Sequence, residues 1–482
     1  MSYTDKYEVV IGLEVHAQLL TESKIFNADA TEFGNLPNTN VCVHTLAHPG
    51  TLPKLNKKVV EFAMKMGLAC HSEITRYQYF DRKNYFYPDL PKGYQTTQDK
   101  TPICKGGFVP IKLKDGSTKN VGLTKVHMEE DAGKSMHLDF ETDTLVDLNR
   151  AGVPLIEIVT NPDIRNADEA HAFLTEVRKL VRYLDICDGN MEEGSLRCDV
   201  NISLRLHGAK EYGKKVEVKN LNSFNYVKRA IEFEIQRQAE ILEKGETVVS
   251  ETRTFNTVEF KTYSLRTKED LNDYRYFPEP DLQPFVVSEE WLNSVKIAMP
   301  PLPHDLHLKF TKEYGLPEYD AAVLTDTKEI ALYFDDLCQK TKHYKSASNW
   351  IMGPVKSYLN ELTLHVSQFP ITTEKLAGII DLVEGNKVSN SVATQKIYPE
   401  MLKNPSKTAL QLAEELNLLQ VSNDDFIKPI VEQVIASMPE KVAQYKKGQK
   451  GLLGLFMGEV MKKAGGKADP KKATEILKGL LD

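Results

Sequence analysis

"YEVVIGLEVHAQL", residues 7–19, alternates apolar and polar side chains over most of its length. A period of two residues is typical of a β-strand that buries one face and leaves the other accessible. The same pattern returns in "GFVPIKLKDG" (107–116), "RCDVNISLRLHG" (197–208) and "KKVEVKNLNSF" (214–224), with Gly, Pro, Asn and Asp nearby. These runs predict mainly antiparallel strands from residue 1 to about residue 290.

Helical periodicity interrupts the strands twice and then replaces them. Apolar residues at helical spacing predict one helix over 225–245, ended by Gly245, and another over 167–184. The prolines of "MPPLPHDLHLKF" (299–310) mark a boundary, after which every pattern is helical, and a second boundary is expected near 405–425. The expected fold class is α+β: a β-rich antiparallel cradle domain over 1–295, an all-α helical domain over 296–408, and a small helical tail domain over 409–482.

The composition is that of a soluble globular protein, with 41% hydrophobic and 27% charged residues among 482. No run of about 18 apolar residues exists, so we expect no membrane span. The N-terminus lacks both the apolar core of a signal peptide and the Arg/Ser-rich bias of a transit peptide. The six cysteines form no C-x-x-C pair, which favours a reducing, cytoplasmic location and argues against a thiolate zinc site.

The charge is spread unevenly along the chain. Residues 441–482 carry ten Lys against four Asp or Glu, a net charge of about +6, whereas the whole chain carries −7. A basic tail on an acidic body is compatible with a phosphate-rich partner that binds at one end. A solvated, Lys-rich pair of helices explains the same charge equally well.

The motif "HMEEDAGKS" (127–135) resembles the end of a phosphate-binding loop, but only superficially. A Walker A loop needs a glycine five positions before Gly133, and Met128 stands there instead. The motif is therefore better described as an acidic cluster, Glu129-Glu130-Asp131, beside His127.

Several carboxylates accompany the strand patterns. Glu14 and His16 are two positions apart and would project from the same face of a strand, as would His127, Glu129 and Asp131. Glu157 interrupts the apolar run "VPLIEIV", where an uncompensated carboxylate would be costly. "MEEGSLRCDVN" repeats the Met-Glu-Glu theme and continues with Arg197 and Asp199. Carboxylates with one imidazole suit Mg²⁺ or Mn²⁺ better than Zn²⁺.

Each of these features also has a structural explanation. Glu14 and His16 could be strand-surface residues, Glu157 could pair with Arg150 or Arg197, and residues 129–131 could form a solvated turn. The residue pattern by itself therefore indicates only a possible divalent-metal site.

Basic and aromatic residues alternate in two further motifs, "FDRKNYFYPDLPKGYQ" (80–95) and "DYRYFPEPDLQP" (273–284). Such interleaving can stack an unpaired base while cations hold phosphate. Ordinary aromatic packing at a sheet edge remains the alternative.

Six long motifs occur together and in order: "DRKNYFYPDLPKGYQ", "HMEEDAGKS", "VDLNRAGVPLIEIVT", "MEEGSLRCDVNISLR", "KNLNSF" and "YRYFPEPDLQP". Together they resemble the B subunit of the aspartyl/glutamyl-tRNA amidotransferases, from about Val10 to the C-terminus. The resemblance implies an ATP-dependent carbon–nitrogen ligase with glutamine as amido donor. In that family ATP phosphorylates the side-chain carboxylate of misacylated Asp-tRNA(Asn) or Glu-tRNA(Gln), and ammonia then displaces the phosphate.

The resemblance also implies ligands and partners. These are Mg²⁺ (or Mn²⁺), ATP as a substrate, misacylated tRNA, an amidase-type A subunit that supplies ammonia, and a small C subunit. Some members carry a cysteine-rich zinc insertion after the first strand, but residues 23–50 contain only Cys42, so no zinc is expected here. A tRNA-binding scaffold with a purely structural carboxylate cluster is the alternative from another functional class.

Carried onto this sequence, the family's site residues fall into four groups. The expected metal ligands are Glu14, His16, Glu129 and Glu157, with Glu130 and Asp199 as supporting or alternative ligands. The expected catalytic residues are Glu129, Glu157 and Arg197. The candidates for contacts with ATP or substrate are Arg82, Lys83, Tyr85, Lys92, Arg150, Lys219 and Arg275. The candidates for tRNA binding are Lys446, Lys447, Lys450, Lys462, Lys463 and Lys467.

Overall fold

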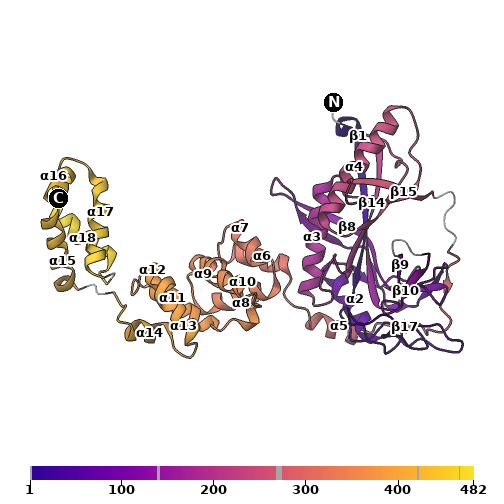
Figure 1. Cartoon of the computed structure of the whole chain (residues 1–482), viewed down its shortest axis with the longest axis horizontal. Helices are drawn as coiled ribbons and strands as arrows, with labels where there is room; N and C mark the ends of the chain where they lie inside the picture. The colour runs from indigo at the N-terminus through magenta and orange to yellow at the C-terminus, as the bar shows by residue number, and fades with distance from the viewer. Residues whose placement is uncertain (1–2, 138–141, 268–273, 421–422, 466, 482) are drawn as a thin grey trace. The chain divides into compact units, whose positions relative to one another are not determined.

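The computed structural model describes residues 3–137, 142–267, 274–420, 423–465 and 467–481. The chain forms two compact units, 1–302 and 303–482. The first is built on β-sheets and the second on helices, which confirms the expected α+β class (Figure 1). The finer division of the helical part at residue 408 stays a prediction.

A ten-stranded sheet forms the centre of the first unit, in the order β15-β14-β13-β12-β1-β11-β8-β6-β2, with β7 paired to β8. β1 (Tyr7–Gln18) lies between β11 (Pro154–Thr160) and β12 (Leu196–Leu206) and is antiparallel to both. Only the pair β13–β14 is parallel among the described pairs, so the expectation of mainly antiparallel strands is confirmed. The other strands are β2 (Glu73–Ile74), β6 (Cys104–Lys105), β7 (Phe108–Lys112), β8 (Thr118–Glu130), β13 (Val216–Leu221), β14 (Glu251–Asn256) and β15 (Lys261–Thr267).

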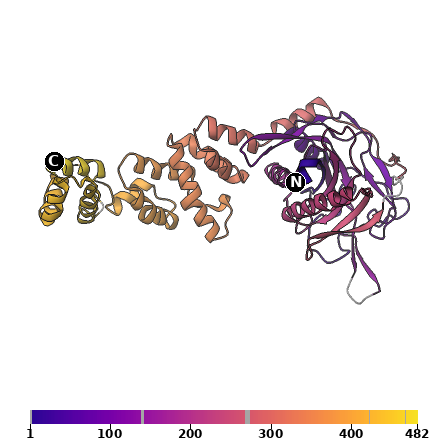
Figure 2. The same cartoon turned by 90° about the horizontal axis from the view of Figure 1, so that it is seen from above.

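Helices cover one face of this sheet, as the view from above shows (Figure 2). α2 (Lys57–Ala69) packs on β8, α3 (Ala167–Tyr183) on β7, and α4 (Phe224–Glu243) on β12. Alternate residues of β1, from Tyr7 to Ala17, are buried in the core that they share. Both sequence-predicted helices are confirmed to within two residues at each end. The alternation leaves the polar residues of the central strands on the opposite face.

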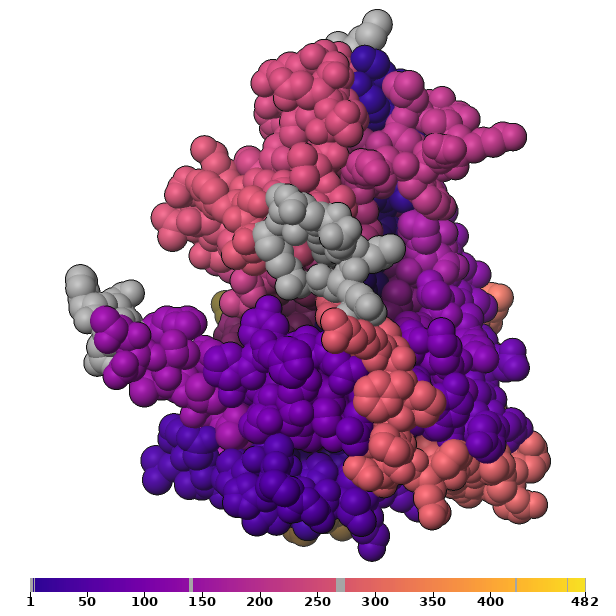
Figure 3. Space-filling model, turned by 90° about the vertical axis from the view of Figure 1, so that its right-hand side faces the viewer, coloured from indigo at the N-terminus to yellow at the C-terminus, as the bar shows by residue number. Residues whose placement is uncertain are grey.

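Small sheets bring distant segments of the first unit together. β16 (Phe277–Pro278) pairs with β4 (Asp81–Asn84), and β17 (Phe285–Val286) pairs with β3 (Tyr77–Gln78). Figure 3 shows the segment after residue 274 running beside the segment near residue 80. The two basic and aromatic motifs are therefore neighbours. The remaining elements of the first unit are α1 (Tyr3–Lys6), β5 (Tyr94–Thr97), β9 (Lys134–His137), β10 (Thr144–Asp147) and α5 (Glu289–Ile297).

The second unit consists of helices. The first group comprises α6 (Pro303–Lys312), α7 (Glu318–Leu324), α8 (Lys328–Lys340), α9 (Tyr344–Trp350), η1 (Ile351–Val355), α10 (Lys356–Glu361), η2 (Val366–Gln368), α11 (Thr373–Glu384), α12 (Asn390–Val392), η3 (Ala393–Ile397), α13 (Tyr398–Lys403) and α14 (Ala409–Glu415). The last group comprises α15 (Asp424–Ser437), α16 (Pro439–Lys446), η4 (Lys450–Leu452), α17 (Leu453–Lys463) and α18 (Pro470–Leu481). This last group has an apolar core of its own, which includes Val431, Phe456 and Leu477. Within the described residues, none of the helices combines the length and apolar character that crossing a membrane requires.

Candidate active site

The strand register places acidic and imidazole residues in one row across the main sheet. His16 on β1 lies opposite Glu157 on β11, and Glu157 lies opposite His127 on β8. On its other side His16 lies opposite Arg197 on β12. Because side chains alternate between the faces of a strand, this row and the polar residues two positions away share the face opposite the helices.

A cavity of about 260 Å³ lies on this face. Its lining includes six carboxylates, four basic side chains and two tyrosines. They are Glu14, Glu129, Asp131, Glu157, Asp199 and Glu217; His16, Lys83, Arg197 and Lys219; and Tyr85 and Tyr274. A small cavity surrounded by charges of both signs is suited to a charged ligand.

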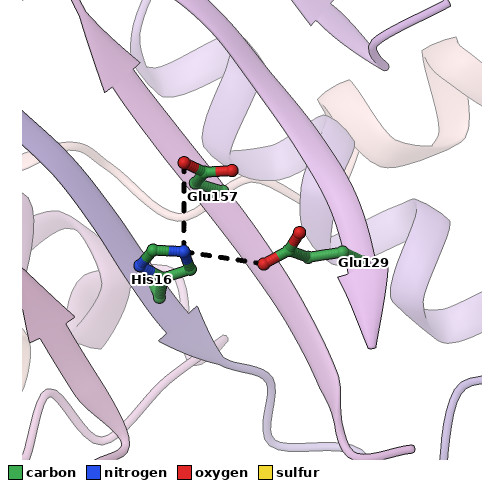
Figure 4. Close-up of side chains that lie close together, drawn as sticks. All are labelled: His16, Glu129 and Glu157. Atoms are coloured by element: carbon green, nitrogen blue, oxygen red, sulfur yellow. Dashed lines mark ion pairs between the residues drawn. The ribbon is translucent and has the colours of Figure 1, made fainter. Parts of the chain in front are cut away.

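The first cluster of possible metal ligands consists of His16, Glu129 and Glu157. His16 Nε2 lies 3.6 Å from Glu129 Oε1 and 3.9 Å from Glu157 Oε1, so one nitrogen of the imidazole faces both carboxylates (Figure 4). Ligand atoms from all three residues lie within 4.8 Å of one another. One imidazole and two carboxylates within that span fit a divalent cation that prefers oxygen ligands and keeps positions open.

Buried charges in this cluster compensate one another. Burial opposes ionisation of Glu157, but His127, His16 and Lys83 outweigh it and hold the pKa of the Glu157 carboxyl well below its usual range. Glu129 is shifted in the same direction, because contact with His127 outweighs its burial and lowers its pKa. Burial likewise opposes the charge of His127, yet the two carboxylates raise its pKa to about 9. Both carboxylates are therefore held as anions.

A second cluster, Glu14, Asp199 and Glu217, lies in the same cavity. Asn201 donates a hydrogen bond to Glu14 Oε1 at 2.8 Å, and Lys219 pairs with Asp199 and with Glu217. Burial, followed by the charges of Glu157 and Asp199, raises the pKa of Glu14. This carboxyl lacks the imidazole partners of the first cluster, so its anionic form is stabilised less than the anionic forms of Glu129 and Glu157.

The structure thus divides the four residues expected to hold one metal. His16, Glu129 and Glu157 belong to the first cluster, whereas Glu14 belongs to the second. Asp199 joins Glu14, but Glu130 does not line the cavity, because it pairs with Lys92 and accepts a hydrogen bond from the Thr96 amide.

Two structural explanations left open by the sequence are wrong. Residues 129–131 do not form a solvated turn, since they are 3–6% exposed. Glu157 pairs with neither arginine: Arg197 forms two hydrogen bonds of 3.0 Å with Asp131, and Arg150 lies 3.5 Å from the same carboxylate. These two arginines hold the pKa of Asp131 below its usual range despite burial.

The candidates for contacts with ATP or substrate separate into two groups. Lys83, Tyr85 and Lys219 line the cavity, and Lys83 Nζ lies 4.8 Å from the ring centre of Tyr274. The remaining candidates are not among its lining residues. Arg82 pairs with Glu279 and Asp281, and Lys92 pairs with Glu130. Arg150 donates hydrogen bonds to the carbonyls of Ala132 and Gly133. Arg275 directly follows Tyr274 in the chain and has a φ of 45°.

Glu217 and Tyr274 are lining residues that sequence reasoning did not select. Glu217 stands between Val216 and Val218, and this is the same signal, a carboxylate inside an apolar strand, that drew attention to Glu157. Tyr274 belongs to the basic and aromatic motif over 273–284, but no local pattern in that motif places it at the cavity. Its place follows from the pairing of β16 with β4, which brings its ring centre 6.2 Å from that of Tyr85.

The tail lysines lie in the second unit, on and near α16 and α17. Lys446, Lys447, Lys462 and Lys463 are exposed and form no ion pair within the part of the chain that the structure describes. Lys467 is half-buried, and Lys450 is exposed, with its ammonium 4.2 Å from the ring centre of Tyr445. Most of these charges are therefore accessible to a partner.

Two family models match the chain: residues 9–293 match the GatB/GatE catalytic domain, and residues 332–481 match the GatB domain. A protein of Syntrophotalea carbinolica, named as the B subunit of aspartyl/glutamyl-tRNA(Asn/Gln) amidotransferase, is 47% identical over 475 residues, which cover 98% of each chain. Proteins with the same name from Thermoanaerobacter pseudethanolicus and Chlorobium limicola are 46% identical over 473 residues and 47% identical over 477 residues. These alignments cover 98% and 99% of this chain, and 99% and 100% of the respective relatives.

Proposed function

The chain belongs to the family of aspartyl/glutamyl-tRNA(Asn/Gln) amidotransferase B subunits, and we propose that its acidic cavity is where the misacylated amino acid is activated and amidated. ATP phosphorylates the side-chain carboxylate of Asp-tRNA(Asn) or Glu-tRNA(Gln), and ADP leaves. Ammonia then attacks the acyl phosphate, inorganic phosphate departs, and the amide remains on the tRNA. The observation that carries this proposal is the pair of partly buried carboxylate clusters around one cavity.

Mg²⁺ (or Mn²⁺) would be held by His16, Glu129 and Glu157, and a second ion by Glu14, Asp199 and Glu217. Such a cation would neutralise negative charge on phosphate oxygens, which is the main requirement of phosphoryl transfer. The first cluster is suited to permanent occupancy, because its carboxylates are already anionic. The second cluster is suited to an ion that binds only together with ATP. Without ATP, Lys219 already balances part of its negative charge by pairing with two of its carboxylates.

The basic side chains of the cavity would bind the anionic substrates. Lys83 and Lys219 line the cavity beside the two clusters and can approach phosphate oxygens. Arg197 is fixed by its two hydrogen bonds to Asp131 and can orient the carboxylate that is to be activated. Tyr85 and Tyr274 supply aromatic surface next to these cations, which fits the terminal nucleotide of a tRNA or the base of ATP.

The relatives are named as one subunit of an amidotransferase, and we extend this to an assembly that also contains an amidase-type A subunit, together with a small C subunit. The A subunit would hydrolyse glutamine and deliver ammonia. The tail lysines would hold the body of the tRNA while its 3′ end enters the cavity, since phosphate contacts position a nucleic acid without reading its sequence.

The test is ATP consumption by the assembled enzyme with each charged tRNA in turn. ADP release that requires misacylated tRNA, a divalent cation and an intact Glu157 supports the proposal. ADP release that is unchanged without a divalent cation, or in Glu157→Gln, would instead favour a scaffold whose carboxylates are structural.

A further inference from the structure

His127 is a buried histidine that the proposed chemistry does not use. It is 4% exposed and does not line the cavity. Its position on β8 is opposite Glu157 and two residues before Glu129, so it shares their face of the sheet but is covered by other parts of the chain. A buried polar ring usually forms at least one hydrogen bond with the surrounding protein.

Glu157 and Glu129 each turn one oxygen towards each of two histidines. Glu157 Oε2 lies 2.9 Å from His127 Nε2, whereas Glu157 Oε1 lies 3.9 Å from His16 Nε2. Glu129 Oε2 lies 3.6 Å from His127 Nε2, and Glu129 Oε1 lies 3.6 Å from His16 Nε2. His16 lines the cavity and His127 does not, so the two imidazoles face opposite sides of the same carboxylate pair.

All the polar contacts of the His127 ring are made through one nitrogen. Nδ1 is buried and has no hydrogen-bond partner within the described residues, whereas Nε2 has carboxylate acceptors within reach. Nε2 therefore carries an N–H that donates to Glu157, whether the ring is neutral or protonated. A ring that leaves its other nitrogen unsatisfied in the core is placed for the sake of this one donor.

We propose that His127 is a positioning residue, which holds the Oε2 oxygens of Glu157 and Glu129 and thereby turns their Oε1 oxygens and His16 Nε2 towards a divalent cation. The inference rests on the proposed function, because it takes a cation at the first cluster as its premise. Removing the hydrogen-bond partner of a metal ligand typically lowers metal affinity by about 10- to 100-fold.

Three substitutions separate the donor from the bulk of the ring. His127→Gln keeps an N–H at the end of a side chain of similar reach, whereas His127→Asn is one bond shorter and places its N–H near the original Nδ1. His127→Leu fills the space without any donor. If the Leu variant fails to fold, the comparison of Asn with Gln still tests the proposal, because both side chains are polar and differ in where the N–H donor lies.

The probe is Mn²⁺ alone, added without ATP to the full-length chain in its assembled enzyme. Manganese beside His16 gives an electron spin echo signal coupled to imidazole nitrogen, and the carboxylate-only second cluster gives none. The dissociation constant of the nitrogen-coupled Mn²⁺ should rise at least about tenfold in Leu and Asn and stay within about threefold in Gln. Folding is checked in each variant by its melting temperature.

The outcomes are distinct. Absence of any nitrogen-coupled Mn²⁺ in the unchanged protein overturns the proposed cation site and this inference with it. Binding in the unchanged protein that persists undiminished in folded Leu or Asn variants overturns the inference alone, as does equal loss in Gln and Asn. Kinetics give a second readout: the Mg²⁺ concentration for half-maximal activity should rise about tenfold in Asn, while kcat at saturating Mg²⁺ stays within about threefold.

Discussion

The cradle cavity gathers carboxylates and the tail gathers lysines, but they do so in opposite ways. Glu14, Glu129 and Glu157 come from three strands that are far apart in the sequence, and imidazoles, amides and cations surround them. Lys446 and Lys463 lie on short neighbouring helices and face water. The cavity needs long-range strand pairing in order to exist, whereas the tail needs only local helices.

Burial determines what each set of charges can do. The partly buried carboxylates of the cavity have shifted pKa values and fixed partners, so they can favour one distribution of substrate charge over another. Exposed lysines attract phosphates over a distance that salt shortens to about 10 Å at 0.1 M. Changes in the cavity should therefore act on kcat, and changes in the tail should act on the KM for tRNA and on its salt dependence.

Glu157→Gln should give the largest effect. The substitution keeps the shape of the side chain but removes the charge that faces both His16 and His127. We expect ATP-dependent activation to fall about 10²-fold or more in kcat, with the KM for aminoacyl-tRNA within about threefold. ADP release in single turnovers measures the step directly.

The matched control is Glu192→Gln, which changes an exposed carboxylate in the second Met-Glu-Glu motif of the same unit. It should leave both constants unchanged. Near-normal kcat in Glu157→Gln would show that this carboxylate is only a structural partner of the histidines.

Glutamine hydrolysis distinguishes the chain from its assembly. No amidase-type Gly/Ser-rich loop and no G-x-C-x-G motif occur in the sequence, so we expect the purified chain alone to release no ammonia from glutamine. Ammonium should replace glutamine in an assembly whose amidase has been inactivated. Ammonia release above the background rate by the isolated chain would contradict the proposed role of the A subunit.

Removal of the tail should give a smaller effect of a different kind. Deletion from about residue 410 removes the helices with their own apolar core, and the sheet of the first unit should remain folded. We expect the KM for aminoacyl-tRNA to rise at least about tenfold and its dependence on salt to flatten, while Mn²⁺ binding in the cradle is retained. Unchanged tRNA affinity across a salt series would mean that the tail serves assembly or stability.

Replacing only Lys462 and Lys463 by Gln tests the charge without removing the fold. The double substitution should raise the KM for aminoacyl-tRNA about two- to fourfold. It should also reduce the slope of log affinity against log salt concentration by about 1–2, because each neutralised phosphate contributes about 0.9 to that slope. Lys472 is a useful control, since it is already paired with Asp424 and Glu475. A substitution there should have less effect on the salt slope.

Local patterns in the sequence were sufficient for much of this molecule. The alternation in β1 and the helical spacing of α3 and α4 identified their elements, and the carboxylate of Glu157 within an apolar run pointed to the site. Strand order and register could not be read locally, because pairing joins segments more than a hundred residues apart. For that reason the sequence did not select Glu217 and left open a pairing of Glu157 with an arginine, while the grouping of Glu14 with His16 as ligands of one metal stays a prediction.

The smallest predicted effect concerns the destabilisation of the fold by the ionised carboxyl of Glu14. The pKa of Glu14 is raised in the folded chain, so ionising this carboxyl above its unfolded pKa destabilises the fold, and below the unfolded value the penalty vanishes. Glu14→Gln should therefore raise the melting temperature of the metal-free chain by about 1–3 °C at pH 7, with the gain disappearing as the pH falls below about 4.5. Lys463→Gln, which changes a solvated charge of the tail, should not alter the melting temperature at either pH.

Added Mg²⁺ should reverse the order of the melting temperatures, so that the unchanged chain becomes more stable than Glu14→Gln. The reason is that the unchanged chain gains binding energy at Glu14 that the variant cannot gain. Scanning calorimetry in chelator and in Mg²⁺ at both pH values measures all of these differences. A variant that is less stable than the unchanged chain in chelator at pH 7 would contradict the view that the second cluster is destabilised by its own charge.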